Sequence, residues 1–299
     1  MSRALNPSTL VLLLLPPLFW AGNAVVGRAL VGHFPPLALS FARWALALVL
    51  LTPFAIGAVR RHRVAIRAHL PVLALTALLG VGCYNSLQYL ALQTSTAVNA
   101  TLIGASGPIM TLLVGAVWFK SPVRRRQGAG AALSVIGVLW VIARGEPLNL
   151  LRLQFDAGDV IMLVATLTWS LYTWLLQTRR PPLPLSAFLF VQIGLGTVMI
   201  LPFALAEYAL TGASAAPTVS NAAALLYVAL LPSLVAYYCW DRGVARAGAV
   251  LPMYFVNLTP VLAGLLSWLL LGEAVGWHHL AGGALILAGI HLAAQPASK

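Results

Sequence analysis

The chain is built from long apolar runs separated by short breaks that carry polar residues, proline or glycine. A helix needs about 20 consecutive apolar residues to cross a bilayer. Ten such runs lie at residues 10–30, 36–58, 71–92, 97–118, 127–143, 157–178, 184–206, 221–241, 246–271 and 277–294. We therefore predict an all-α integral membrane protein with ten transmembrane helices and almost no chain left for a soluble domain.

The composition excludes a water-soluble protein, because 61% of the 299 residues are hydrophobic, 8% are charged and the mean hydropathy is +0.92. The first run could instead be a signal peptide, with Arg3 before the apolar segment LVLLLLPPLFW and GNA as the cleavage site. Against this alternative, Asn6-Pro7-Ser8 is typical of a helix start, and the internal repeat needs Trp20 to remain in the chain.

The net charge of +12 is distributed as a membrane protein requires. With both termini in the cytoplasm, 14 of the 18 Lys and Arg residues lie in cytoplasmic segments, three lie outside, and Arg43 falls within the second run. This excess of cytoplasmic cations follows the positive-inside rule, so we predict cytoplasmic termini. No aromatic or groove-shaped element accompanies the basic clusters, which argues against a nucleic-acid partner.

The chain also repeats itself. Chance rarely produces matches of tryptophan, proline and glycine. At an offset of 149 residues, the matches are Trp20 with Trp169, Pro35 with Pro184 and Pro53 with Pro202. At an offset of 152, they are Pro108 with Pro260, Gly130 with Gly282 and Gly137 with Gly289. The repeat units are residues 7–143 and 157–294. Each contains five runs, an odd number, so the second unit is predicted to be inverted. A substrate site between inverted repeats can open to either side of a membrane by rocking.

The segment GDVIMLVATLTWSLYTWLLQ at 158–177, with the Pro-containing helix that ends in LLLGE and the glycine-spaced last helix, resembles the EamA-type branch of the drug/metabolite transporter superfamily. The general look is most similar to YddG-like amino-acid exporters. The resemblance implies an exporter of small metabolites, above all aromatic and neutral amino acids, in a bacterial cytoplasmic (inner) membrane. Export of other metabolites, or of cationic drugs coupled to protons, is the alternative.

The family pattern places an acid after both the fourth and the ninth helix, whereas this chain has Glu273 after the ninth but Lys120 after the fourth. Glu273 could cap the next helix or pair across the repeat, or it could couple transport to an ion. Pro260 and Pro108 each remove one helical hydrogen bond. The carbonyl freed in this way could face a water-filled cavity, or the proline could simply kink the helix.

The glycines at 130, 137, 282 and 289 form pairs seven residues apart, so each pair faces one way and permits close helix packing. In small multidrug transporters of the resembled superfamily, such helices pair between subunits. Packing within one chain is the alternative, and we expect a monomer rather than a homodimer.

Polar and aromatic residues inside the runs are the candidate substrate-binding residues. Amides are costly against lipid but can bind amino or carboxylate groups from a cavity, and aromatic rings supply flat walls and cation–π contacts. Pairs spaced three or four apart share a helix face. The candidates are Trp20, Asn23, Arg43, Tyr84, Gln88, Asn99, Trp169, Tyr172, Tyr237, Tyr238, Tyr254 and Asn257, with Trp240 beside them in the eighth run. Core packing or anchoring at the lipid interface is the alternative for each aromatic residue.

Arg43 is a special case, since an arginine near the centre of a membrane helix costs about 2.5–3.5 kcal/mol to insert. It could bind a substrate carboxylate or pair within the protein. Its match at the offset of 149 is Gln192, which is uncharged.

An intramembrane enzyme is a rival class, but the chain contains no HExxH motif, and neither a Ser-Lys pair nor a pair of aspartates can be assembled from its apolar runs, so we expect neither catalysis nor a metal or cofactor. A channel would need a carbonyl-rich filter or rings of charge, and neither is evident. Four acids fall near predicted helix ends, namely Asp159, Glu207, Asp241 and Glu273. We therefore predict alternating access without an obligatory proton gradient.

Overall fold

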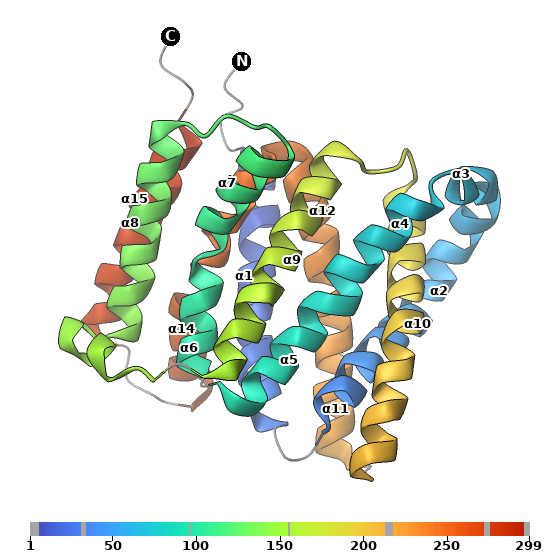
Figure 1. Cartoon of the computed structure of the whole chain (residues 1–299), viewed down its shortest axis with the longest axis horizontal. Coiled ribbons are helices and arrows are strands. Elements are labelled where there is room, and N and C mark those ends of the chain that lie inside the picture. Colours follow the sequence, from blue (N-terminus) through green and yellow to red (C-terminus); the bar gives the residue numbers. More distant parts are fainter. Residues whose placement is uncertain are drawn as a thin grey trace.

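The computed structural model describes residues 6–30, 34–95, 97–154, 156–212, 218–271 and 276–295, and for residues 24, 25, 27–29, 97–99, 101, 267, 270 and 271 it describes the backbone alone. All regular structure within these ranges is helical (Figure 1). The elements are α1 (Pro7–Ala29), α2 (Pro36–Arg61), α3 (Arg63–Ala68), α4 (Leu70–Ala77), η1 (Leu78–Cys83), α5 (Tyr84–Thr94), α6 (Ala97–Ala105), α7 (Gly107–Trp118), α8 (Arg125–Ile142), η2 (Pro147–Arg152), α9 (Ala157–Thr178), α10 (Leu185–Thr211), α11 (Val219–Val228), η3 (Ala229–Val235), α12 (Ala236–Ala247), α13 (Val250–Val256), α14 (Thr259–Leu271) and α15 (Trp277–Ala294).

The prediction of an all-α protein is confirmed for the described residues, and helix occupies each of the ten predicted ranges. Among the described residues, five helical stretches are long and apolar enough to cross a membrane by length and composition: 36–61, 70–94, 157–178, 185–211 and 219–247. The fourth and ninth ranges are broken, between α6 and α7 and between α13 and α14.

The two ends of the helical bundle differ in charge. In Figure 1, α1 begins and α15 ends at the upper end, which also carries α3. The basic segments 60–67 and 124–126 flank helices at this upper end, whereas Arg144 and Arg152 follow α8 toward the opposite end. The segments assigned to the cytoplasm on charge therefore lie together.

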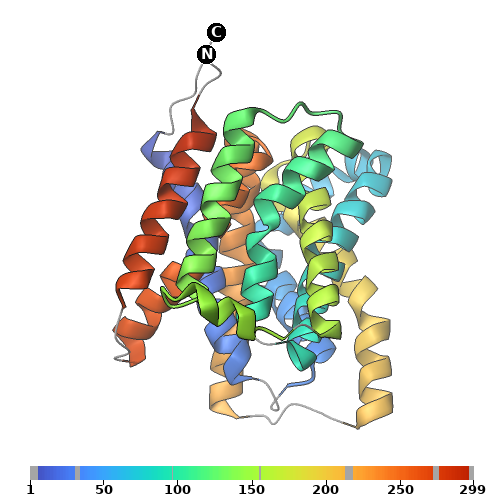
Figure 2. The same ribbon diagram turned by 60° about the vertical axis from the view of Figure 1, so that its left-hand side comes forward.

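The helices α8 and α15 pack along their lengths and run antiparallel, side by side in both views (Figures 1 and 2). A Cβ added at Gly130 would come within 2.7 Å of the Gly289 carbonyl oxygen, and one at Gly137 within 2.7 Å of the Gly282 carbonyl oxygen. The four glycines thus allow the backbones of α8 and α15 to pack closely within one chain. This is the alternative to pairing of these helices between subunits.

Acidic side chains stabilise helix starts. The N-terminus of α2 begins with Pro36, which has no N–H, and the Glu207 carboxylate of α10 accepts from the amides of Leu37 (3.0 Å) and Ala38 (2.8 Å). At α9, Asp156 accepts from the Gly158 amide (2.8 Å), and Asp159 accepts from the Asp156 amide (2.8 Å). These bonds satisfy donors that a helix start leaves open.

Two π-helical turns interrupt long helices at related positions. The turn η1 joins α4 to α5, and η3 joins α11 to α12, so that Gly80 of η1 and Pro232 of η3 stand 152 residues apart, the second offset of the repeat. Such turns are rare and concentrate at functional sites. Both lie beside the largest buried cluster of hydrophobic side chains.

Candidate functional site

Six aromatic side chains meet in the middle of the protein, and we call them the central aromatic cluster: Trp20, Tyr84, Trp169, Tyr172, Tyr237 and Trp240. Trp169 of α9 is at its centre, with ring centroids 5.3 Å from Trp20, 4.7 Å from Tyr84 and 5.2 Å from Trp240. Tyr172 and Tyr237 lie 5.0 and 5.5 Å from it. The rings come from α1, α5, α9 and α12, and so from both predicted repeat units.

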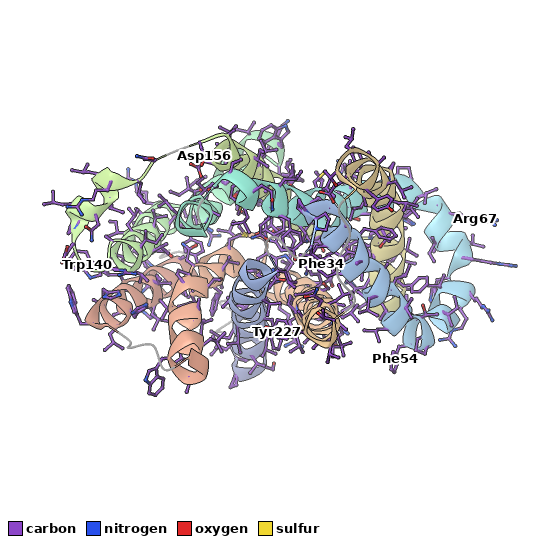
Figure 3. All side chains as sticks on the ribbon, turned by 90° about the horizontal axis from the view of Figure 1, so that it is seen from below. Phe34, Phe54, Arg67, Trp140, Asp156 and Tyr227 are labelled. Carbon is purple, nitrogen blue, oxygen red and sulfur yellow. The ribbon has the colours of Figure 1, made fainter. Side chains whose placement is uncertain are left out.

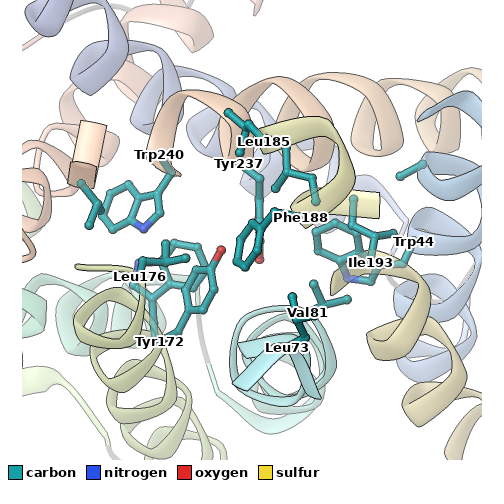
Figure 4. Close-up of a cluster of buried hydrophobic side chains, with 14 of the residues drawn as sticks. Trp44, Leu73, Val81, Tyr172, Leu176, Leu185, Phe188, Ile193, Tyr237 and Trp240 are labelled. Atoms are coloured by element: carbon teal, nitrogen blue, oxygen red, sulfur yellow. The ribbon is translucent and has the colours of Figure 1, made fainter. Parts of the chain in front are cut away.

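Figure 4 shows how the cluster continues toward α2. The Tyr237 side chain reaches into the middle, with Tyr172 and Trp240 to one side and Trp44 to the other. Trp44 packs edge-on against Tyr237 at 4.9 Å. Edge-to-face pairs of this kind contribute about 0.5–1.5 kcal/mol each beyond burial, so the rings hold each other in place.

The π turns supply hydrogen-bond acceptors to this cluster. The indole Nε1 of Trp20 donates to the Pro232 carbonyl (3.1 Å), and the Tyr237 hydroxyl donates to the Gly80 carbonyl (2.5 Å). Trp20 is in the first half of the chain and its acceptor is in η3 of the second half, whereas Tyr237 is in the second half and its acceptor is in η1 of the first. The amide of Asn85 also donates to the Tyr237 oxygen (3.1 Å).

Arg43 of α2 is fully buried beside the cluster. Its Nε and Nη2 donate to the Ser233 hydroxyl (3.0 and 2.7 Å), and its Nη1 donates to the Asn85 side-chain oxygen (3.0 Å) and the Tyr89 hydroxyl (2.7 Å). The guanidinium also lies 5.1 Å from the Trp44 ring centroid. We call Arg43, Asn85, Tyr89 and Ser233 the Arg43 cluster.

Other candidates join this region at its edges. Asn23 is buried, and its side-chain oxygen accepts from the Tyr89 hydroxyl (3.4 Å). Tyr172 donates to Gln192 (3.5 Å), whose amide in turn donates to the Thr76 carbonyl (3.2 Å). Gln88 is half-buried on α5.

The structure does not bring every candidate to this region. Tyr238 is 45% exposed, and the guanidinium of Arg242 lies 5.7 Å from its ring centroid. Tyr254 is buried in a different hydrophobic cluster and donates to the Gln127 carbonyl (2.6 Å). The Asn99 side chain and Glu273 lie outside the described residues.

At the break between α13 and α14, several polar groups find partners within the protein, although the buried Asn257 Oδ1 accepts no hydrogen bond. The Val256 carbonyl, whose helical partner would be the missing N–H of Pro260, accepts from the Thr259 hydroxyl (2.6 Å). The Asn257 amide donates to Ser134 (2.9 Å) and to the Ala105 carbonyl (3.3 Å). These contacts favour a kink over a carbonyl that faces a cavity.

The eighth helix continues past its predicted end at Asp241. The helical stretch 219–247 extends to Ala247, so Asp241 lies within its last two turns, and its side chain is buried. The apolar run stops at Asp241, but the helix goes on because Arg242 and Arg246 face outward while Gly243 and Val244 stay buried. Asp241 pairs with Arg180 of the α9–α10 turn, with Oδ2 and Nε 3.1 Å apart.

A small hollow of about 10 Å³, room for about one water molecule, lies between the ends of α1, α2 and α5. Its lining includes Leu30, Phe34, Leu39, Gln93 and the Tyr89 of the Arg43 cluster. Figure 3 views the bundle from this end, and Phe34 lies near the middle while Phe54 and Arg67 lie toward one side. The hollow therefore leads toward Tyr89 from the end opposite α3.

Sequence reasoning missed Asn85, Tyr89 and Ser233. The first two are polar residues four apart in an apolar run, the same signal that selected Tyr84 and Gln88 one residue earlier. Ser233 follows Pro232, and its hydroxyl also donates to the Val228 carbonyl (2.7 Å) within the π turn, a geometry that helical spacing does not predict.

Comparison with known protein families adds a decisive observation. The EamA-like transporter family matches this sequence over residues 7–143 and 156–295. The chain belongs to the EamA-like transporter family. The resemblance inferred from the 158–177 segment and the glycine-spaced last helix is thereby confirmed, and the protein is an integral membrane transporter rather than a protein of a soluble class.

Relatives of this EamA-like transporter extend over nearly the whole chain. An uncharacterized transporter of Archaeoglobus fulgidus is 30% identical, covering 96% of this chain and 98% of its own. A probable amino-acid metabolite efflux pump of Salmonella typhimurium is 29% identical over 94% and 93%. A probable terminal-alkyne amino-acid exporter of Streptantibioticus cattleyicolor is 28% identical over 94% and 91%.

The fold has also been seen in a crystal structure. That protein superimposes with a TM-score of 0.75 over 96% of both chains at 21% sequence identity. At this identity the likeness concerns the fold alone.

Proposed function

We propose that this EamA-like transporter exports aromatic and neutral amino acids by alternating access, with the substrate bound at the central aromatic cluster. The observation that carries the proposal is the meeting of Trp20 and Trp169 at 5.3 Å, because these two residues are repeat mates from opposite halves. Two of the relatives carry names that describe amino-acid efflux or export. Large apolar and aromatic side chains suit a binding site walled by rings, and the neighbouring amides suit amino and carboxylate groups.

Alternating access rests on the inverted repeat of residues 7–143 and 157–294, with ten transmembrane helices. Three observations support it. The family matches the chain in two stretches with nearly these bounds. The π turns η1 and η3 stand at the repeat offset. The contact of Gly130 with Gly289 is the repeat image of that between Gly137 and Gly282. A pseudo-two-fold relation of this kind permits both halves to exchange conformations.

Transport is proposed to run down the substrate gradient without an obligatory proton gradient, with both termini in the cytoplasm. Asp159 and Glu207 support this, since both carboxylates cap helix starts. Asp241 favours the alternative of a proton-coupled exporter of other metabolites or cationic drugs, because it is a buried carboxylate inside a predicted membrane helix. Proteoliposomes loaded with substrate distinguish the two: a flux that vanishes when the pH gradient and potential are collapsed overturns the uncoupled mechanism.

The substrate assignment is tested by Trp169→Ala in purified protein reconstituted in liposomes. Removing the central ring should raise the half-saturation concentration for phenylalanine and leucine by about tenfold or change their order of preference. Trp118→Ala is the matched control, since Trp118 is 62% exposed at the end of α7. If both variants handle a panel of amino acids as the parent does, the cluster is packing and the assignment loses its structural support.

A further inference from the structure

The Arg43 cluster holds a positive charge without a negative partner. Of the chain's six acids, the structure describes five, and each is engaged elsewhere or exposed. Asp241 pairs with Arg180, Asp156 and Asp159 cap α9, Glu207 caps α2, and Glu146 is exposed in the turn before η2. No described carboxylate lies within 4.0 Å of the Arg43 guanidinium, whose hydrogen-bond partners are all neutral.

Structure alone does not require a charge at this place. Gln192 occupies the matching position on α10, is equally buried, and uses an uncharged amide to bond Tyr172 and the Thr76 carbonyl. A buried charge is normally paired, and a guanidinium cannot escape its charge by losing a proton. The positive charge of Arg43 is therefore available to an anion that the described part of the chain does not provide.

The position of the guanidinium suits one end of an amino acid. Asn85 bonds both Arg43 and the Tyr237 hydroxyl, so a single side chain separates the charge from the central aromatic cluster. On the other side, Tyr89 links Arg43 to the oxygen of Asn23, an acceptor of the kind that an ammonium group needs. The hollow at the ends of α1, α2 and α5 reaches Tyr89 from the surface.

We propose that Arg43 binds the carboxylate of the transported amino acid, with the Tyr89 and Ser233 hydroxyls as the neutral groups that occupy the guanidinium when no substrate is bound. The planar fork of arginine matches a carboxylate through two parallel hydrogen bonds, a geometry that lysine does not reproduce. The inference rests on the proposed function and makes the carboxylate, rather than the side chain, the feature common to all substrates.

The test is counterflow of radiolabelled phenylalanine in liposomes containing the purified protein, with three competitors. Unlabelled phenylalanine and 3-phenylpropionate carry a carboxylate, whereas phenylalaninamide lacks it. In the parent protein the amide should compete at least about tenfold more weakly than phenylalanine, because it leaves the buried charge unpaired. Arg43→Gln should reduce the difference in competition between phenylalanine and its amide to about twofold, because only phenylalanine then binds more weakly. Arg43→Lys should give a difference between those of the parent and Arg43→Gln.

Arg242→Gln is the matched control, because Arg242 is exposed on α12, and it should keep the parent's ratio. An Arg43→Gln variant that discriminates acid from amide as the parent does overturns the proposal. If that variant fails to fold, the parent decides alone, since equal competition by phenylalanine and its amide also overturns it. A parent protein without any phenylalanine counterflow overturns the amino-acid assignment itself, a result distinct from the other two.

Discussion

Two arginine sites in this protein, one on a buried guanidinium and one beside a buried carboxylate, handle their charges in opposite ways. Arg43 is completely enclosed and bonds only neutral groups, whereas Arg180 is 26% exposed and lies 3.1 Å from a buried carboxylate. Their partners Tyr89 and Asp241 stand 152 residues apart, so in the proposed inverted repeat they occupy matching places, near opposite ends of the bundle. The comparison separates a charge that stabilises the fold from a charge kept for a ligand.

Arg180→Gln is expected to have the largest effect on stability. It leaves the Asp241 carboxylate buried without a cation, and such a loss costs about 3–5 kcal/mol in fully enclosed pairs. Because Arg180 is partly exposed, we expect about 2–3 kcal/mol, measured as the free energy of unfolding in detergent mixtures with increasing dodecyl sulfate. The double variant Arg180→Gln with Asp241→Asn should recover most of the loss. A double variant as unstable as the single one would show that the Arg180–Asp241 ion pair does not account for the lost stability.

Arg43→Gln should change the same free energy of unfolding by less than about 1 kcal/mol. The substitution loses hydrogen bonds of about 1 kcal/mol each, but it also removes an unpaired buried charge, and the two effects oppose each other. A loss as large as that of Arg180→Gln would contradict the comparison, because the charge of Arg43 would then be structural.

Arg242→Gln should have the smallest effect, below about 0.5 kcal/mol. Arg242 is exposed, and its guanidinium lies over the face of the Tyr238 ring. Exposed charges contribute little to stability. The same unfolding measurement checks it. A loss above 1 kcal/mol would mean that Asp241 is stabilised by Arg242 rather than by Arg180.

The sequence was sufficient for the helices and for bringing together most rings of the central aromatic cluster. Apolar runs of membrane length are visible because lipid offers no partner for backbone amides, so each spanning segment has to be a helix. The meeting of Trp20 and Trp169 followed from the repeat offset, and Tyr84, Tyr172 and Tyr237 came from spacing within single helices.

Spacing alone did not indicate which face of α5 turns toward Arg43. Asn85 and Tyr89 follow the π turn η1, which adds one residue to a helical turn and so shifts every later side chain by about 100° relative to the preceding helix. The end of the eighth helix was placed too early for a different reason, since hydropathy records where apolar residues stop and not where the hydrogen bonds of a helix stop. Tyr254 and Asn257 depend on packing between distant helices, which neither period nor offset encodes.

The Glu207 contact has a consequence for how the protein is made. The first amides of α2 find their acceptor on α10, a helix that is synthesised about 170 residues later. Until α10 has entered the membrane, α2 must leave those donors to water or lipid headgroups. During synthesis, the first half of the chain therefore cannot complete its native hydrogen bonds by itself. The start of α2 acquires its acceptor only when α10 of the second half has been inserted.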